Sequence, residues 1–284
     1  MALNTTTEDT ALGEDHSALA AACDAGVGLC TIVGIEGSFS RKRGAQLAVL
    51  PDGSTVGSLS DNCLEAQLVS DLLHSGEPRV LRYGRGSSKV DFRLPCGGGL
   101  DIHLDPHPDK AVLRRIVARL RKRQPSSLSI EFGGGEFVRH YKPNLRLMAL
   151  GEGPELAAIS NLAREMRIDC LIQDRSRLSL GRSSPEVNYD PWTACLLLFH
   201  DHEWELPLIE QALATDAFYI GAQGGERART DRLLALTSLG ISEEDISRIT
   251  SPVGVIPSCK TPGTLALSAI AEIVQRYDET CVRF

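Results

Sequence analysis

The chain has 284 residues, of which 42% are hydrophobic and 24% charged, and its formal net charge is −7. This composition is typical of a globular protein, and the negative charge disfavours a dedicated nucleic-acid binder. The eight cysteines form no CxxC pair, which argues against a disulfide framework or a zinc cluster. Neither a signal-peptide pattern nor an apolar run of roughly 18 residues is found, so we expect a cytoplasmic protein without membrane or nucleic-acid partners.

A chain of this length is near the point at which single cores split, so two domains are expected. The first, residues 1–106, is predicted to be a small α+β domain of short strands around tight turns. Its helix is expected within residues 64–76, where Leu64, Leu68 and Leu72 share one face and Gly76 follows. Its strands are expected at 30–36, 46–50, 55–59, 79–83 and 100–104.

Residues 107–143 are predicted to be a linker that contains an amphipathic helix. Leu113, Ile116, Val117 and Leu120 share one face of the run "AVLRRIVARLRKR", and a Gly-rich segment suited to a turn follows it. The basic residues of this helix favour a solvated surface, with an anion site as the alternative.

From residue 144 to 284 near-continuous apolar strands alternate with helices, which indicates a parallel sheet covered on both faces. The fold class is therefore α/β, a small N-terminal α+β domain followed by a C-terminal Rossmann-like parallel-sheet domain. Thr261 is the expected N-cap of the last helix, with Pro262 at its first position.

A partial dinucleotide fingerprint opens this second half. Gly151, Gly153 and Ala157 form a G-x-G-x-x-x-A turn, and Asp174 stands about where a ribose-binding acid is expected. Glu152 within the turn would oppose a diphosphate. The alternative is a turn that serves the fold alone.

Residues 200–205, "HDHEWE", directly follow the third apolar strand of this half. Imidazoles and carboxylates at the carboxyl end of a parallel strand suit a metal or a proton transfer. A loop cluster that caps the next helix is the alternative. Templates of hydrolases, kinases and helical zinc proteases are missing from the sequence.

Two cysteines of the first half stand in settings that favour chemistry. Cys63 lies between a strand and the start of a helix, where the helix dipole favours a thiolate. Cys96 is followed by Gly97 and Gly98 in "LPCGGGLD", a loop on which bulky groups could reach the sulfur. Buried, inert thiols remain the alternative for both.

Several motifs, in the right order, resemble the XdhC/CoxI accessory proteins of molybdenum hydroxylases. In the first half they are "GSFSRKRGAQLAVLPDGSTVGSLSDNCLEA", "GEPRVLRYG" and "LPCGGGLDI". In the second half they are "LLFHDHEWELPLIEQALATDAFYIGAQGGERAR", "GISEEDISRITSPVG" and "KTPGTLALSAIAEIV". The chain departs from the family pattern at Asp61 and Asn62, which replace a Gly-Gly pair, and at Pro154, which replaces a histidine.

The resemblance implies a maturation factor rather than an enzyme. It would bind the molybdenum cofactor, support its sulfuration by a cysteine desulfurase and deliver it to an apo hydroxylase of the xanthine dehydrogenase type. Cys63 and Cys96 would contact the cofactor and its metal beside the bare backbone of Gly97 and Gly98. Glu65 would support the site or handle a proton.

Arg41 and Arg43 would bind the phosphate of the pterin. Two other functions remain open, an NAD(P)-dependent oxidoreductase that uses Gly151, Gly153 and Asp174, and a thiol or persulfide carrier without cofactor. A homodimer would bring the two halves together.

Overall fold

The computed structural model describes residues 12–13, 16–60, 62–87, 97–133, 135–185 and 188–280, without the side chains of Asn62, Cys63 and His202. The chain forms two compact units that divide between Pro143 and Asn144. Each unit has its own hydrophobic core, so each is described by itself.

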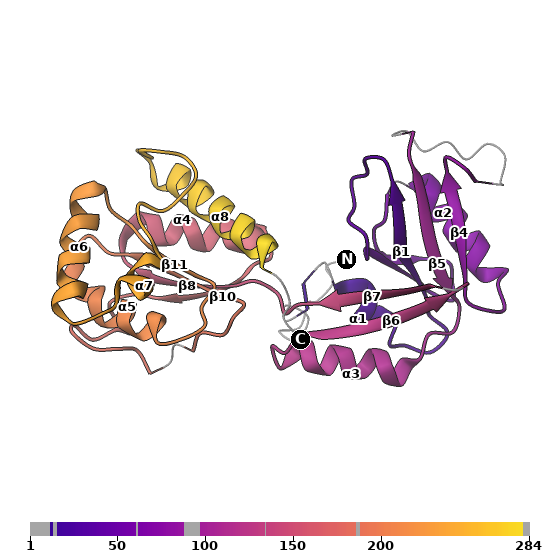
Figure 1. Ribbon diagram of the computed structural model, residues 1–284, viewed down its shortest axis with the longest axis horizontal. Coiled ribbons are helices and arrows are strands. Elements are labelled where there is room, and N and C mark those ends of the chain that lie inside the picture. Colours follow the sequence, from indigo (N-terminus) through magenta and orange to yellow (C-terminus); the bar gives the residue numbers. More distant parts are fainter. Residues whose placement is uncertain are drawn as a thin grey trace. The chain divides into compact units, whose positions relative to one another are not determined.

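The first unit is built on an antiparallel sheet with the strand order β3-β2-β1-β5-β4 (Figure 1). Its strands are β1 (Gly28–Glu36), β2 (Gln46–Val49), β3 (Thr55–Gly57), β4 (Arg79–Gly84) and β5 (Gly99–Asp105). Its helices are α1 (Ser17–Ala21), α2 (Asn62–Leu73) and α3 (Lys110–Arg121).

The predicted strands and the helix of this sheet domain are present, and the sheet has a core on each face. Helix α2 covers one face, because Leu64, Leu68 and Leu72 pack against β1, β2 and β5. Helices α1 and α3 cover the other face. A β-bulge interrupts β1 between Ile32 and Gly34, where the register to β5 shifts.

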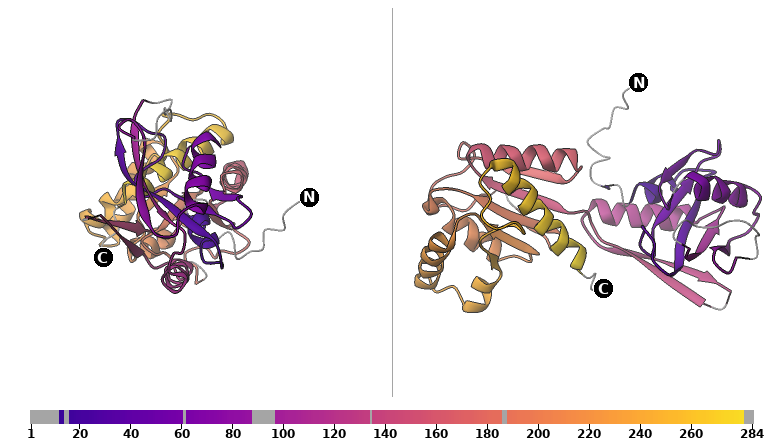
Figure 2. Two further views of the ribbon diagram at one scale, coloured as in Figure 1. Left: turned by 90° about the vertical axis from the view of Figure 1, so that its right-hand side faces the viewer. Right: turned by 90° about the horizontal axis from the view of Figure 1, so that it is seen from above.

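Residues 107–143, expected as a linker, are instead part of the first unit. The predicted amphipathic helix is α3, and its apolar face is buried against α1 and the sheet because this stripe needs a partner. The Gly-rich segment forms the turn of a hairpin of β6 (Ser126–Phe132) and β7 (Gly135–Tyr141), which Figure 2 shows from two further sides.

A hydrogen-bond chain ties this hairpin to the sheet. The buried hydroxyl of Tyr141 donates to Oε1 of Gln46 at 3.0 Å, and Nε2 of Gln46 donates to Oγ1 of Thr31 at 3.1 Å. The Arg139 guanidinium lies over the Tyr141 ring, 4.9 Å from its centroid. The hairpin is therefore fixed to β1 and β2 by polar as well as apolar contacts.

The second unit contains the expected Rossmann-like parallel sheet, in the order β12-β11-β10-β8-β9. Its strands are β8 (Arg146–Gly151), β9 (Asp169–Gln173), β10 (Thr193–Leu198), β11 (Tyr219–Ala222) and β12 (Ile249–Thr250). Its helices are α4 (Gly153–Glu165), η2 (His202–Trp204), α5 (Leu206–Leu213), α6 (Glu226–Ser238), α7 (Glu243–Ser247) and α8 (Pro262–Glu279). The strand order reverses between β8 and β10, which in such sheets opens a crevice at the carboxyl ends.

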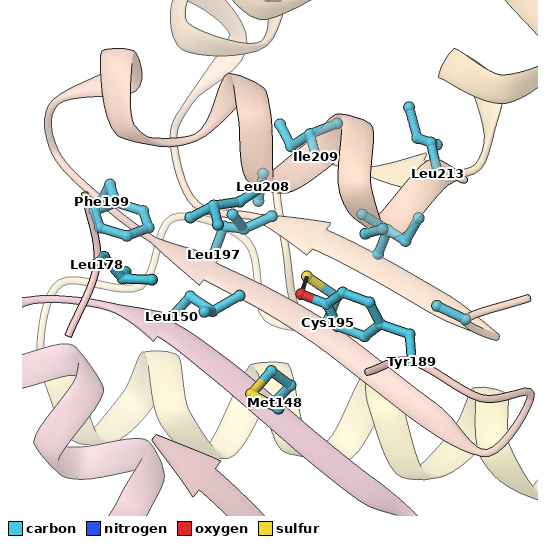
Figure 3. Close-up of a cluster of buried hydrophobic side chains, with 14 of the residues drawn as sticks. Met148, Leu150, Leu178, Tyr189, Cys195, Leu197, Phe199, Leu208, Ile209 and Leu213 are labelled. Atoms are coloured by element: carbon cyan, nitrogen blue, oxygen red, sulfur yellow. Dashed lines mark hydrogen bonds between the residues drawn. The ribbon is translucent and has the colours of Figure 1, made fainter. Parts of the chain in front are cut away.

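Helices cover both faces of this sheet, as the near-continuous apolar strands predict (Figure 1). Helices α4 and α8 pack on one face and α5 on the other. In the core under α5, Leu150, Leu197 and Ile209 belong to one buried cluster, and the Tyr189 hydroxyl lies 3.2 Å from the Cys195 sulfur (Figure 3). Thr261 caps α8 as predicted, because its Oγ1 accepts from the Thr264 amide.

Within the described parts of the chain, every helix is too short or too polar to cross a bilayer.

Candidate functional site

The strand register gathers three connections at one end of the antiparallel sheet. Glu36 at the end of β1 pairs with Gly99 at the start of β5, and Gly99 pairs with Gly84 at the end of β4. Gly57 at the end of β3 pairs with Leu47 near the start of β2. The β1–β2, β3–α2 and β4–β5 connections therefore leave the sheet on the same side, and these three carry the predicted site residues.

Contacts between these connections confirm that they are close. A Cβ atom added to Gly37 would lie 3.5 Å from the Cα atom of Gly98. Nη2 of Arg41 donates to Oγ of Ser58 at 3.4 Å, which joins the β1–β2 and β3–α2 connections. Arg41 is otherwise exposed, so it can meet an incoming anion.

Gly97 and Gly98 differ in their surroundings. Gly97 is exposed with a φ of 66°, and a Cβ atom there would meet no atom of the described residues within 4 Å. Gly98 is buried, and its carbonyl accepts a hydrogen bond from the Arg85 amide at 2.9 Å. The space beside Gly97 is therefore not occupied by any described residue. Cys96 itself lies outside the described residues, so its predicted role stays a prediction.

Glu65 organises the connection that leads to Cys63. Its Oε1 atom accepts from the amide of Leu59 at 3.0 Å and from that of Ser60 at 3.4 Å. Leu59 is fully buried in the core, which anchors the same segment. Cys63 is the second residue of α2, but its side chain is not described. Glu65 thus fixes the backbone just before this cysteine.

Arg43 is held by the β-bulge and by the hairpin. Its Nε atom donates to the carbonyl of Val33, which the bulge leaves without a strand partner. Its guanidinium lies over the ring of Phe137, 4.5 Å from the centroid. Arg43 therefore has a structural task that Arg41 lacks, and of the two Arg41 is the better placed for a phosphate.

An arginine that the sequence analysis did not single out lies at the same sheet end. Arg82 pairs with Glu36 and, at 3.0 Å, with Asp101, and its Nε atom donates to the Arg85 carbonyl at 2.9 Å. A Cβ atom on Gly99 would clash with Nη2 of Arg82. Gly99 is thus needed for this network, which holds the start of β5 just after the cysteine loop.

Candidate metal ligands are few among the described side chains. In that part of the chain, no group of three or more His, Cys, Asp or Glu residues is placed to hold a metal ion. Cys30 and Cys195 are fully buried, and burial raises the pKa of each thiol to about 12. Such thiols are inert core residues, as expected for most of the cysteines.

In the second unit, the backbone of the fold by itself requires glycine at both Gly151 and Gly153, the two glycines of the dinucleotide fingerprint. A Cβ atom on Gly151 would lie 2.5 Å from the carbonyl oxygen of Leu198, and Gly153 has a φ of 82°. Gly153 and Asp174 nevertheless line one cavity of about 550 Å³ at the carboxyl ends of β8 and β9. The two predicted residues are therefore brought together.

The "HDHEWE" segment forms no metal centre among its described side chains. Oδ1 of Asp201 accepts a hydrogen bond from the Glu203 amide at 3.1 Å and so caps the short helix η2. This agrees with the alternative interpretation, in which the segment caps the helix that follows it. Nε2 of His200 lies 4.0 Å from Oε2 of Glu155. Glu205 turns inward and pairs with Arg232 at 2.8 Å in the core.

Two family models match the chain. Residues 21–84 match the model described as "XdhC and CoxI family". Residues 147–273 match the model described as "XdhC Rossmann domain". The first range contains Arg41, Cys63 and Glu65, and the second contains the cavity beside Gly153.

Similar proteins span nearly the whole chain. The Escherichia coli protein named "Molybdenum cofactor insertion chaperone PaoD" is 34% identical over 90% of this chain and 86% of its own length. A Bacillus subtilis protein whose name describes it as a probable xanthine dehydrogenase subunit is 23% identical over 89% and 94%. A crystal structure titled as a xanthine dehydrogenase from Bacillus halodurans has the same fold, with a TM-score of 0.69, 19% identity and coverage of 93% and 95%. The chain therefore belongs to the XdhC and CoxI family.

Proposed function

We propose that this protein is an accessory chaperone for molybdenum enzymes. It binds the molybdenum cofactor in the first unit and holds it while a cysteine desulfurase provides the sulfur for its terminal sulfido ligand. It then delivers the cofactor to an apo hydroxylase of the xanthine dehydrogenase type. Family membership and the similarity to a protein named as a molybdenum cofactor insertion chaperone support this proposal.

The placement of the proposed cofactor site rests on the arrangement of three connections of the antiparallel sheet. The connections that hold Arg41, Cys63 and Gly97 leave the same end of the antiparallel sheet, and two of them touch through Arg41 and Ser58. A site built from three connections can surround a cargo larger than a single side chain. The cofactor is the cargo of this site rather than a resident group.

The chemistry of these residues suits the cargo. Thiolates of Cys63 and Cys96 would be soft ligands, which suit molybdenum or a persulfide. The space beside Gly97, which no described residue occupies, would admit a flat ring system close to the backbone. Arg41 supplies a guanidinium for the phosphate, and Glu65 fixes the segment before Cys63.

The test is to express the chain in a host that makes molybdenum cofactor and to measure molybdenum and pterin per chain. We expect about one of each on the wild type and about tenfold less on Cys96→Ala and Cys63→Ala, which requires the dissociation constant to rise about 100-fold, or ~2.7 kcal/mol. Cys259→Ala is the matched control, because this cysteine lies in the second unit, and its loading should equal that of the wild type.

Two outcomes would overturn the proposal. If the wild-type protein contained neither molybdenum nor pterin, the proposal that it binds the molybdenum cofactor would be refuted. Full loading of Cys96→Ala and Cys63→Ala alike would remove the proposed site. Rapid alkylation of either cysteine in a wild type that takes up no molybdenum would point instead to the thiol or persulfide carrier.

A further inference from the structure

The cavity of the second unit is lined by both apolar and polar residues. Leu156, Ala157 and Ile172 contribute apolar surface from α4 and β9. The remaining lining residues are polar or glycine, namely Glu152, Gly153, Ser160, Asp174, Arg175 and Ser176. In doubly wound sheets this is the position of a nucleoside, with its base on apolar residues and its ribose at the acid after the second strand.

The position that a nucleotide phosphate would need is taken by the chain's own carboxylate. A Cβ atom on Gly153 would lie 3.3 Å from Oε2 of Glu155, so this carboxylate lies over the glycine turn. That oxygen is buried and accepts no hydrogen bond from the described residues, and His200 lies 4.0 Å from it. Pro154 in the first turn of α4 removes one of the amide donors that would bind phosphate.

Arg175 does not provide a free cation for a phosphate either. Its Nη2 atom lies 2.7 Å from Oε1 of Glu152 and 3.7 Å from Oδ2 of Asp201. Its guanidinium lies over the Trp204 ring, 4.9 Å from the centroid. Two carboxylates and an aromatic face thus hold this arginine, and the turn as a whole repels anions.

Asp174 keeps an acceptor for a ribose. Its Oδ1 atom accepts from the amide and the hydroxyl of Ser176, at 2.9 and 2.5 Å. These hydrogen bonds hold the pKa of the Asp174 carboxyl below its usual value, so it is ionised at neutral pH. Oδ2 accepts no hydrogen bond from the described residues, so it can accept from two neighbouring hydroxyl groups.

We infer that this cavity binds a ribonucleoside and excludes its 5′-phosphate. The base would rest on Leu156, Ala157 and Ile172, and the 2′,3′-diol would donate to Asp174. Glu152 and Glu155 would reject the phosphate at the turn. This inference is independent of the cofactor site in the first unit, and it excludes the use of this turn for a dinucleotide.

Calorimetric titration of the full chain tests the inference. The probes are adenosine, guanosine, cytidine and uridine, each compared with its 2′-deoxy form and its 5′-monophosphate. We expect at least one ribonucleoside to bind about tenfold more tightly than either counterpart. In Glu155→Gln the preference over the monophosphate should shrink, because the charge is removed while the shape is kept. In Asp174→Asn the preference over the deoxy form should disappear.

The control is Asp216→Asn, an exposed acid elsewhere in the same unit, which should titrate as the wild type does. The inference is wrong if no ribonucleoside binds up to about 10 mM, a free energy of only ~3 kcal/mol. It is equally wrong if a monophosphate or a deoxy form binds the wild type as tightly as the ribonucleoside. Fluorescence melting of each variant checks that the unit is folded.

Discussion

The buried ion pair of the second unit yields the sharpest stability prediction. Arg232 on α6 makes two hydrogen bonds to Glu205, and the side chains are 2% and 0% exposed. The same guanidinium donates to Oγ of Ser251 at 2.9 Å and to the carbonyl of Gln223 at 2.8 Å. One cation thus joins four segments of the unit, and Glu205→Gln leaves that cation buried without its counter-ion.

The cost follows from this burial. Removing one partner of a buried pair costs about 3–5 kcal/mol, because solvent does not screen the charge left behind. The unit spans residues 144–283. At ~2.1 cal/mol/K per residue its unfolding entropy is about 0.3 kcal/mol/K, so the melting temperature of Glu205→Gln should fall by ~10–15 °C. Replacing both partners, as Arg232→Met with Glu205→Leu, should cost less than Glu205→Gln alone.

Tryptophan fluorescence isolates the unit in which this pair lies. The only tryptophans of the chain are Trp192 and Trp204, and both belong to the second unit. Glu226→Gln is the matched control, because it breaks an exposed pair with Arg229 on the same helix and should cost under ~0.5 kcal/mol. A shift for Glu205→Gln no larger than that of the control would refute the reasoning.

Three further predictions concern the cores. Burial raises the pKa of the Cys30 and Cys195 thiols to about 12, so only about one thiol in 10⁴ is ionised at pH 8. Iodoacetamide should therefore leave both cysteines unmodified in the native protein and label them after denaturation. Peptide mass spectrometry measures this labelling. Buried His103 has its pKa lowered by desolvation, so the unfolded state takes up the proton first and the first unit should lose stability as pH falls below about 6.5. His103→Gln should flatten that dependence in melts followed by circular dichroism, and an unchanged slope would contradict this. Tyr141→Phe removes the hydrogen bond to Gln46 and should cost about 1 kcal/mol, seen as faster amide exchange in β2 and β7; equal exchange rates would show that the bond contributes nothing.

The sequence predicted those helices and strands whose hydrophobic pattern lies within their own residues. β8 and β10 are short apolar runs, and α2 repeats leucine at helical spacing, so both sheets and this helix could be predicted. The strands of the β6–β7 hairpin were not predicted, although residues 127–132 of β6 alternate between polar and apolar.

The candidate site depends on contacts that local patterns do not contain. Arg43 meets Phe137 and Arg82 meets both Glu36 and Asp101, pairs that only the folded sheet brings together. Motif order indicated the three site connections, but the partners that hold them come from distant strands. That Glu152 would oppose a diphosphate follows from its local position in the turn, and it stays a prediction.

The anchoring of the β6–β7 hairpin to the sheet determines where a mechanical force on the chain between the two units acts. Tyr141 is followed after two residues by the boundary at Asn144, and its side chain is hydrogen-bonded to Gln46 at the start of β2. Any tension on the covalent connection between the units is therefore delivered to β2 and to the adjoining loop that contains Arg41.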